Sequence, residues 1–356
     1  MYAVALPARP GPPASDTQGP AGRALPPRPA PARAPGRRRP APQGFVTWQD
    51  CGVGSLMLLD TASLYFRAFY GYPDTVTAPD GTPVNAIRGL LDGIARLVKD
   101  GRPRPERLVA CLDADWRPQF RVDAIPSYKA HRAEPDGTEQ VPPALAVQIP
   151  LIIGVLEAAG VAIAEHAGYE ADDIIATLAT RSPTPVDVVS GDRDLFQLVD
   201  DERHVRVLYT QRGLARLEAV DEAVVSAKYG IPARAYADFA VLRGDPSDGL
   251  PGVPGIGEKT AATLIGAFGS LAALTSALDA GHGGFPTGAR KKLEAARGYL
   301  DVAPAVVKTV TDVPLPEVDG TLPASPPDPE LLAEMGQALA LGSSLTRFRD
   351  AVTKAT

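Results

Sequence analysis

The stretch Leu56-Met-Leu-Leu-Asp60 is a short apolar run that ends in a carboxylate. It has the length and composition of a buried β-strand. Two further runs in the chain share the pattern, Leu108 to Leu112 followed by Asp113, and Val186 to Ser190 followed by Asp192 and Asp194. The repetition predicts three strands that each deliver acidic side chains at their carboxyl ends.

Stretches with helical periodicity separate these runs, so the chain alternates strand and helix. That alternation predicts an α/β fold with a mostly parallel sheet flanked by helices. In open sheets of this class, ligands bind beyond the carboxyl ends of the strands. Three strands with aspartates at that edge therefore indicate a functional site there. The helical stretches are 84–98, 145–159 and 174–180.

The first 54 residues differ in composition from the rest. They contain 12 prolines, seven arginines and no lysine, and a segment of this kind buries too little apolar area to fold. We expect residues 1–54 to be a disordered tail. Two other interpretations stay open: the arginines Arg37 to Arg39 form a weak nucleic-acid or targeting patch, or translation begins later, for example at Met57.

The remainder of the 356-residue chain is acidic, with 29 basic against 40 acidic residues. An evenly acidic surface would repel nucleic acid, so a nucleic-acid-binding protein of this charge must concentrate its acids and neutralise them with cations. Two cysteines and four scattered histidines offer neither a disulfide framework nor zinc-ligand spacing. No apolar run approaches the roughly 20 residues of a membrane span. We expect a cytoplasmic protein.

A second subdomain follows the sheet. From residue 221 the pattern changes to helices joined by Gly and Pro turns, centred on the glycine-rich run 251–257. We divide the chain into a catalytic subdomain at 55–220, a helical subdomain at 221–310 and a C-terminal segment at 311–356. Within these parts we expect a mobile loop at 134–143, a short strand at 306–310 and a final helix at 329–341.

The motif Gly168-Tyr-Glu-Ala-Asp-Asp-Ile-Ile175 adds a further group of acids. Alone, it reads as an acidic helix start. With the strand-end acids it belongs to a set of nine, which could not all stay ionised at one edge without counterions. Hard oxygen ligands imply Mg²⁺ or Mn²⁺, and two such ions about 3.5 to 4 Å apart support phosphodiester hydrolysis. The nine are Asp60, Asp113, Glu170, Asp172, Asp173, Asp192, Asp194, Asp245 and Asp248.

Two segments have the composition of a nucleic-acid contact. The glycine-rich turn precedes a helix that carries Lys259, so its backbone N–H groups could approach a phosphate closely. Segment 116–132 interleaves Arg117, Arg121, Lys129 and Arg132 with aromatic residues, as single-strand-binding surfaces do. The alternative is an ordinary amphipathic helix whose aromatic residues lie in the core and whose arginines are solvated. We favour this alternative for Trp116 and Phe120.

Seven blocks in order give the chain a resemblance to the bacterial 5′–3′ exonuclease and flap endonuclease family, which includes the N-terminal nuclease domain of bacterial DNA polymerase I. The resemblance spans about residues 55 to 310. The blocks are Leu-Leu-Asp60, Cys-Leu-Asp113, Tyr128-Lys-Ala-His-Arg132, Gly-Tyr-Glu170-Ala-Asp-Asp173, Ser-Gly-Asp192-Arg-Asp194, Arg-Gly-Asp245-Pro-Ser-Asp248 and Leu250-Pro-Gly-Val-Pro-Gly-Ile-Gly-Glu-Lys-Thr260.

The resemblance implies a PIN-like catalytic sheet, an arch region at about 116–145 and a helix-three-turn-helix subdomain, of helix-hairpin-helix type, that holds duplex DNA, often with a monovalent cation such as K⁺. It implies a first metal group of Asp60, Asp113, Glu170 and Asp172, and a second of Asp192, Asp194 and Asp245 that shares Asp172. Asp173 and Asp248 resemble positions that act through water. Lys129 and Arg132 resemble catalytic residues, and the implied DNA contacts are Tyr128, Lys129, Arg132, Gly252, Gly255, Gly257 and Lys259. Arg67, seven residues beyond Asp60, is a weaker candidate for a phosphate contact.

One position departs from the family, because Gly249 stands where relatives commonly have Asn. The overall expectation is a monomeric, stand-alone, structure-specific 5′–3′ exonuclease or flap endonuclease. It would act on DNA with 5′ ends, flaps or nicks near the nucleoid, in primer removal or repair. The alternatives are a metal-binding DNA scaffold without turnover and, less favoured, a haloacid-type phosphatase.

Overall fold

The computed structural model describes residues 54–101, 104–211, 213–214 and 216–353, which belong to a compact unit spanning Thr47–Thr356. The tail expected at residues 1–54 therefore lies outside the described residues except for Gly54, as do Cys51 and the arginine patch.

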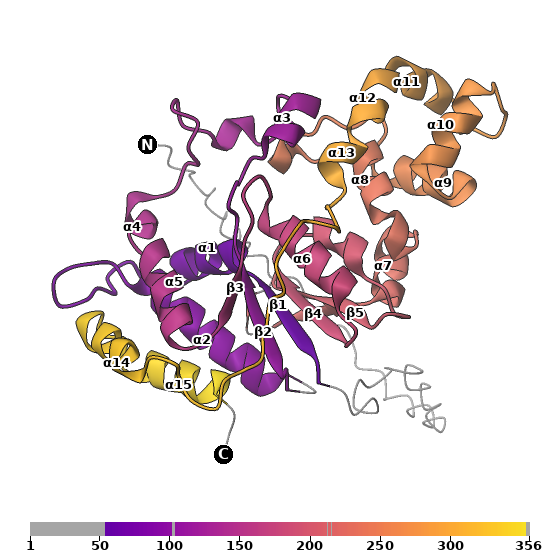
Figure 1. Ribbon diagram of the computed structural model, residues 1–356. Helices are drawn as coiled ribbons and strands as arrows, with labels where there is room; N and C mark the ends of the chain where they lie inside the picture. Colours follow the sequence, from indigo (N-terminus) through magenta and orange to yellow (C-terminus); the bar gives the residue numbers. More distant parts are fainter. Residues whose placement is uncertain (1–53, 102–103, 212, 215, 354–356) are drawn as a thin grey trace, which may run out of the picture. The chain divides into compact units, whose positions relative to one another are not determined.

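A six-stranded sheet forms the centre of the described part (Figure 1), in the order β3-β2-β1-β4-β5-β6. Every neighbouring pair is parallel except the last, where β5 and β6 are antiparallel. The predicted mostly parallel α/β sheet is confirmed. The strands are β1 (Leu56–Asp60), β2 (Arg107–Cys111), β3 (Ala162–Ala164), β4 (Val186–Ser190), β5 (Val205–Tyr209) and β6 (Glu218–Val220).

The central strands are apolar on both sides because helices cover both faces of the sheet. In β1, Leu56 and Leu58 pack into one core, and Met57 and Leu59 pack into the other. The Met57 core lies under α1 (Thr61–Gly71), α2 (Asn85–Asp100), α4 (Pro143–Ala146), α5 (Ile149–Ala158), α14 (Pro329–Ala338) and α15 (Gly342–Val352). The Leu56 core lies under α6 (Ala171–Arg181), η3 (Asp194–Leu198) and α7 (Glu222–Tyr229).

The Leu56 core continues into the helical subdomain, where short helices pack on one another. The strand expected at 306–310 is wrong, because residues 304–307 form a helix turn instead. Pro304 favours the first turn of a helix, and a short apolar run alone cannot distinguish a strand from a buried helix. The elements are η4 (Ala233–Ala235), α8 (Tyr236–Arg243), η5 (Pro246–Asp248), α9 (Glu258–Phe268), α10 (Leu271–Asp279), α11 (Ala289–Ala295), α12 (Arg297–Val302) and α13 (Pro304–Val307).

The region expected to form an arch, 116–145, consists of short elements rather than one long helix. It contains α3 (Gln119–Ala124), η2 (Ala130–Arg132) and a turn closed by an isolated bridge between Ala133 and Glu139. The helix expected at 145–159 is divided into α4 and α5. Pro150 explains the break, because it has no N–H to donate to the carbonyl of Ala146 and is tolerated only in the first turn of a helix, where it stands in α5.

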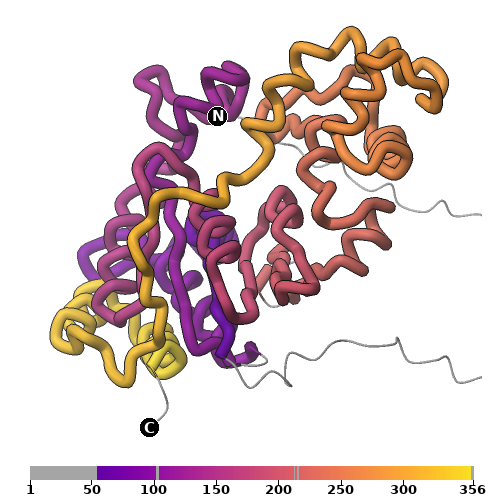
Figure 2. Tube along the Cα trace, turned by 45° about the vertical axis from the view of Figure 1, so that its right-hand side comes forward, coloured from indigo at the N-terminus to yellow at the C-terminus, as the bar shows by residue number. Residues whose placement is uncertain are grey.

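The C-terminal segment runs from the helical subdomain back along the sheet (Figure 2). The side chain of Arg181 donates to the carbonyls of Val313 and Leu315. Farther on, Leu108 N donates to Gly320 O at 2.7 Å, at the amino end of β2. Helix α15 then packs along α2, so this segment ties the two subdomains together and ends at the amino side of the sheet.

Candidate carboxylate-lined active site

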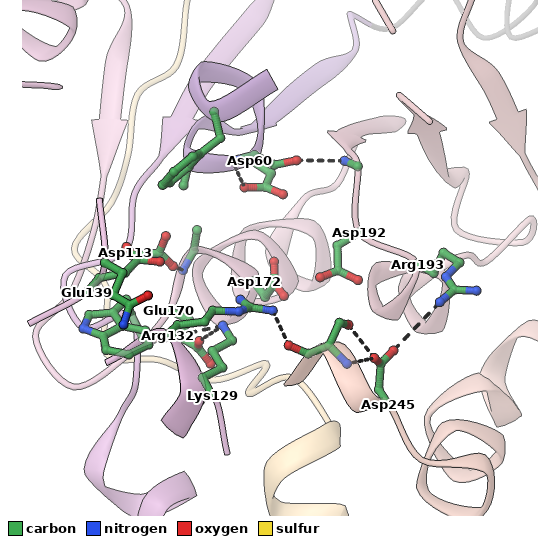
Figure 3. A pocket seen from close by; sticks show the side chains of 18 of the residues that line it. Asp60, Asp113, Lys129, Arg132, Glu139, Glu170, Asp172, Asp192, Arg193 and Asp245 are labelled. Carbon is green, nitrogen blue, oxygen red and sulfur yellow. Dashed lines mark hydrogen bonds and ion pairs between the residues drawn. The ribbon is translucent and has the colours of Figure 1, made fainter. Parts of the chain in front are cut away.

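A cavity of about 870 Å³ opens at the carboxyl edge of the sheet. Figure 3 shows acidic side chains from several elements around it. The strand order explains the gathering, since β2, β1 and β4 are neighbours and their carboxyl ends lie side by side. Six of the nine predicted acids line the cavity: Asp60, Asp113, Glu170, Asp172, Asp192 and Asp245.

Asp60 is held by hydrogen bonds at the end of β1. Its side chain caps α1 by accepting from Ser63 N at 3.1 Å and also accepts from the Ser190 hydroxyl. Burial raises the pKa of Asp60 to about 7, helped by the carboxylates of Asp113 and Asp192 and opposed by these two hydrogen bonds. Ionising Asp60 in the folded protein therefore costs free energy, because its carboxylate is buried away from water.

Asp172 and Asp194 face a second, smaller cavity of about 20 Å³. Burial, followed by neighbouring carboxylates, raises the pKa of both groups well above the usual range. The Oδ1 atom of Asp194 is buried and has no hydrogen-bond partner. Asp172 lines both cavities, as Glu170 does, so these two acids stand between the two groups.

Glu170 is the most heavily engaged of the acids. Its Oε2 accepts from Arg121 and, at 2.8 Å, from Tyr128 Oη, and its Oε1 accepts from Lys129 Nζ. Burial raises the pKa of Glu170, while the charges of Lys129 and Arg121 lower it. In this arrangement the protein's own cations balance the charge of Glu170.

Asp173 does not line the main cavity. It is fully buried and forms an ion pair with Arg121, from Nη2 to Oδ1 at 2.6 Å. It also completes a capping box with Glu170 and accepts from Val310 N at 2.8 Å. Its described contacts are structural, so we leave Asp173 out of the ligand set proposed below.

Asp245 and Asp248 come from the helical subdomain. Asp245 caps η5 by accepting from Ser247 N at 2.9 Å, and Arg193 approaches it at 3.9 Å. Asp248 does not line the main cavity; it borders the smaller one and forms an ion pair of 2.7 Å with Arg132. These two acids thus reach the site through one short turn.

The donor chemistry of the site fits divalent cations, whereas its arrangement does not form a ready-made cage. Among the described side chains, no three His, Cys, Asp or Glu residues are placed so that they could hold a metal ion as they stand. The unpartnered Asp194 oxygen and the raised pKa values of Asp60 and Asp172 are features that an added positive charge would relieve. Lys129 and Arg121 now supply part of that charge at Glu170.

The basic residues predicted from the sequence lie in different settings. Lys129 and Arg132 line the main cavity, and their role toward substrate stays a prediction. Tyr128 is buried with its hydroxyl on Glu170, so it does not offer a face for stacking on a base. The guanidinium of Arg67 lies against Gly191, next to Asp192, and its Nε atom is buried without a hydrogen-bond partner.

The glycine-rich turn at residues 251–257 contains two glycines with the left-handed backbone that favours glycine. Gly252 and Gly255 have φ angles of 63° and 76°, and Gly257 caps α9 without a side-chain hydrogen bond. A side chain on Gly252 would collide with Gly244 N at 2.5 Å, so this glycine permits a close backbone approach. Lys259 is exposed in the first turn of α9.

Several residues at the site escaped the sequence analysis. Arg121 was assigned to a phosphate-facing surface, but it is buried and pairs with Glu170 and Asp173; no sequence signal reveals this. Glu139 was assigned only to a loop, yet it lines the cavity near Asp113. Lys292 of α11 donates to Gly255 O at 2.8 Å.

Trp116 and Phe120 were expected in the core, and this expectation is wrong. Phe120 is 37% exposed, and Trp116 is only partly buried and lines the cavity. The helix there, α3, is only six residues long, so it has no extended apolar face that could bury both rings.

The fold and site define a class of α/β nucleases that joins a resolvase-like sheet to a helical DNA-binding subdomain. The family model for the 5′–3′ exonuclease N-terminal resolvase-like domain matches residues 55–230, and that for the 5′–3′ exonuclease C-terminal SAM fold matches residues 231–330. The chain therefore belongs to the 5′–3′ exonuclease family. The predicted membership and the predicted 5′ nuclease function are confirmed.

Individual relatives agree with this assignment. The chain is 57% identical to a 5′–3′ exonuclease of Streptomyces coelicolor over 83% of its own length and all of that protein. It is 50% identical to a 5′–3′ exonuclease of Mycobacterium tuberculosis, over 83% and 97% of the two chains. The fold is also that of the T5 5′-exonuclease with bound divalent zinc ions, at a TM-score of 0.55, 18% identity and coverage of 84% and 98%.

No single helix in the described part of the chain is long and apolar enough to cross a membrane. Helices α9 and α10 pass the length and composition test only as a pair, and they are bent by 79° relative to each other.

Proposed function

We propose that this protein hydrolyses DNA phosphodiester bonds near 5′ ends and flaps, with a pair of divalent cations held at the carboxylate cavity. The observation that carries the proposal is the convergence of six acids from five separate parts of the chain on one cavity of about 870 Å³. An acidic cavity of this kind attracts phosphate only once cations neutralise it.

The ligand set that we propose has two parts. Asp60, Asp113, Glu170 and Asp172 would hold one ion, and Asp192, Asp194 and Asp245 would hold the other with Asp172 shared. Glu170 could join only after Lys129 leaves it, because its oxygens already accept from three side chains. Asp248 would act at a distance, since it is paired with Arg132.

The bound ions, Mg²⁺ or Mn²⁺, would supply the Lewis acidity that activates water and stabilises the leaving oxygen. The chain's own groups would orient the substrate. Lys129 and Arg132 line the cavity and would contact the reacting phosphate. Hydrogen bonds from Ser63 N and Ser190 keep the Asp60 carboxylate aimed at the cavity.

Duplex DNA would be held by the helical subdomain. The uncapped start of α9 and the exposed Lys259 favour contacts to the phosphate backbone without reading of bases. A K⁺ ion at this turn is part of the proposal, although Lys292 already places one ammonium on Gly255 O. Arg67, beside Gly191, is the corresponding candidate on the catalytic side.

We further propose that the protein acts as a monomer in the cytoplasm near the nucleoid, in primer removal or repair. The catalytic subdomain at 55–220, the helical subdomain at 221–310 and the C-terminal segment at 311–356 remain our proposed division. The last strand ends at Val220, while the family models divide ten residues later. Analytical ultracentrifugation of the purified protein tests whether it is a monomer.

The deciding experiment uses purified full-length protein and a 5′-labelled, 5′-flapped duplex. After chelation and dialysis, Mg²⁺ or Mn²⁺ is titrated back and the product lengths are read on a gel. We expect no product without metal, and flap release or short 5′ products with it. An intact substrate in saturating metal, together with salt-sensitive DNA binding, would instead support the scaffold alternative.

A further inference from the structure

The base of the arch region touches the turn that carries Asp245 and Asp248. Lys129 N donates to Asp248 O at 2.9 Å, and Ser127 Oγ donates to Gly249 O at 2.8 Å. Arg132 adds hydrogen bonds to Ser247 O at 2.6 Å and to the Asp248 carboxylate. We call the contact between residues 127–132 and 247–249 the clasp. Figure 3 shows Arg132 extending toward the turn that carries Asp245, with Lys129 beside it directed at Glu170.

The clasp depends on the absence of a side chain at residue 249. A Cβ atom on Gly249 would lie 2.2 Å from Ser127 O, and real Cβ atoms essentially never approach closer than 3.0 Å. The obstacle is backbone, so it cannot rotate away. Any other residue at 249 therefore forces segment 127–132 and turn 247–249 apart by about 0.8 Å.

The two side chains aimed at the cavity are attached to this contact. Lys129 has a left-handed backbone, with φ of 48°, which a non-glycine residue adopts only when its surroundings hold it. Its N–H bond to Asp248 O is one such restraint, and the bond from Arg117 Nε to Tyr128 O at 2.5 Å is another. Separating the clasp would therefore displace Lys129 and Arg132 together.

We propose that Gly249 is a positioning residue: by admitting Ser127 to van der Waals contact, it fixes Lys129 and Arg132 at the reacting phosphate. This inference rests on the proposed function, because it assigns these two side chains to the phosphate. Displacements of about 1 Å at a reacting group can cost on the order of 100-fold in rate. Gly249 thus affects the turnover step more than the binding of duplex.

The chain offers a matched control at the end of α7. Gly230 has φ 72° and ψ 22°, and Gly249 has φ 72° and ψ 20°, so a substitution meets the same backbone strain at both positions. A Cβ on Gly230 would have nothing within 4 Å. The difference between the two glycines is therefore the clasp alone.

The experiment compares Gly249→Asn and Gly249→Ala with Gly230→Asn and Gly230→Ala on the flapped duplex in Mg²⁺. For the Gly249 pair we expect kcat to fall about 10- to 100-fold, with KM and duplex affinity in Ca²⁺ changed less than about threefold. The Gly230 pair should keep kcat within about twofold. Ser127→Ala, which removes one clasp hydrogen bond without adding bulk, should lower kcat by a few-fold.

A second measurement does not depend on cleavage. In a Trp48→Phe background, Trp116 is the remaining tryptophan, and its carbonyl accepts from Lys129 Nζ at 3.5 Å. Its emission maximum and acrylamide quenching should change in the Gly249 variants and stay constant in the Gly230 variants. Equal kcat losses in both pairs, or unchanged Trp116 fluorescence with unchanged kcat, would overturn the inference. Wild-type protein that never cleaves would overturn the proposed function, while the fluorescence comparison would still judge the clasp.

Discussion

The acids that end the strands and the acids of the helical subdomain are held in different ways. Asp60 and Asp113 accept hydrogen bonds from the starts of α1 and α6, at Ser63 N and Ala171 N, inside one rigid sheet-and-helix framework. Asp245 and Asp248 belong to a short turn. In that turn, Asp248 forms an ion pair with Arg132, which links the turn to the other side of the clasp.

This difference shows where the site is preorganised and where it can adjust. The strand-end acids, Asp60 and Asp113, keep their geometry for as long as the sheet is folded. Burial and neighbouring carboxylates disfavour the charged form of Asp60, so its pKa is raised. The second group depends on how two segments of the chain meet. We therefore expect substitutions at the strand ends to change both the chemical step and the stability of the fold. Substitutions at the clasp should change the alignment of Lys129 and Arg132 with the substrate.

The largest effect should come from Asp172, the residue that the two proposed metal-ligand sets share. Asp172→Ala removes a carboxylate that lines both cavities, so we expect the single-turnover rate on flapped DNA to fall at least about 1,000-fold, or about 4 kcal/mol in the barrier. Duplex affinity, measured by fluorescence anisotropy, should stay within about threefold. Asp123→Ala, which removes an exposed acid of α3, is the control. A variant that loses binding instead of rate would remove Asp172 from the proposed ligands.

A large loss of stability should follow from removing the buried cation that pairs with the acids at the start of α6. Arg121→Met leaves Asp173 and Glu170 without the ion pairs that join them, and breaking a buried pair costs about 3 to 5 kcal/mol. Urea denaturation measures the free energy of unfolding. The matched control is Arg297→Met, because Arg297 also pairs with two acids, Asp279 and Asp301, but on the surface. Equal losses in the two variants would show that burial is not the cause.

The pH dependence of stability tests the stored charge at Asp60. Its folded pKa of about 7 lies above the usual 3.8, so the folded state holds the proton more tightly. The metal-free protein should therefore lose stability as the pH rises from about 4 to 7. Asp60→Asn cannot ionise, so its advantage over wild type should grow to about 2 to 4 kcal/mol at pH 8.

Thermal unfolding at pH 5 and pH 8, with and without Mg²⁺, checks this prediction. Mg²⁺ should reverse the order of the two proteins at pH 8, because only wild type retains the carboxylate. A constant difference between wild type and Asp60→Asn across this range would contradict the pKa assignment.

The smallest effect concerns the helical subdomain. Lys292→Ala removes the ammonium on Gly255 O, so duplex binding should weaken about 3- to 10-fold and the salt slope should fall by about one. Lys291→Ala removes the adjacent exposed charge without that contact. Replacing K⁺ by tetramethylammonium at constant ionic strength should weaken binding further only in Lys292→Ala. If binding by both variants responded equally to K⁺, Lys292 would not act through the contact with Gly255 in the turn.

The sequence predicted the strand-end acids well because two regular features determine them. Each strand is a short, mostly apolar run, and parallel neighbours must end at the same edge, so Asp60, Asp113 and Asp192 had to meet. The role of Arg121 was not predictable in this way. Phe120 and Val122 beside it are apolar but not buried, so the local pattern does not mark Arg121 for burial. Its ion pairs with Glu170 and Asp173 of the α6 start, and its hydrogen bond to Val306 O of α13, are contacts distant in the sequence.

The helices were predicted less exactly than the strands. Helical periodicity continues from residue 145 to 159, but Pro150 divides it into two helices. At 306–310 the apolar residues face the core, and the preceding proline decides in favour of a helix turn. Long-range contacts such as that between Gly249 and Ser127 join residues more than a hundred positions apart, and no local pattern encodes them.

The path of the C-terminal segment has a practical consequence for measurement. Arg104, just before β2, donates to the carbonyls of Ala351 and Thr353, so the last described residues are anchored at the amino end of that strand. The carboxylates gather at the opposite ends of the strands. A fluorophore or surface tether attached after Thr353 would therefore leave the approach of a DNA end unobstructed, which suits single-molecule recordings of individual cleavage events.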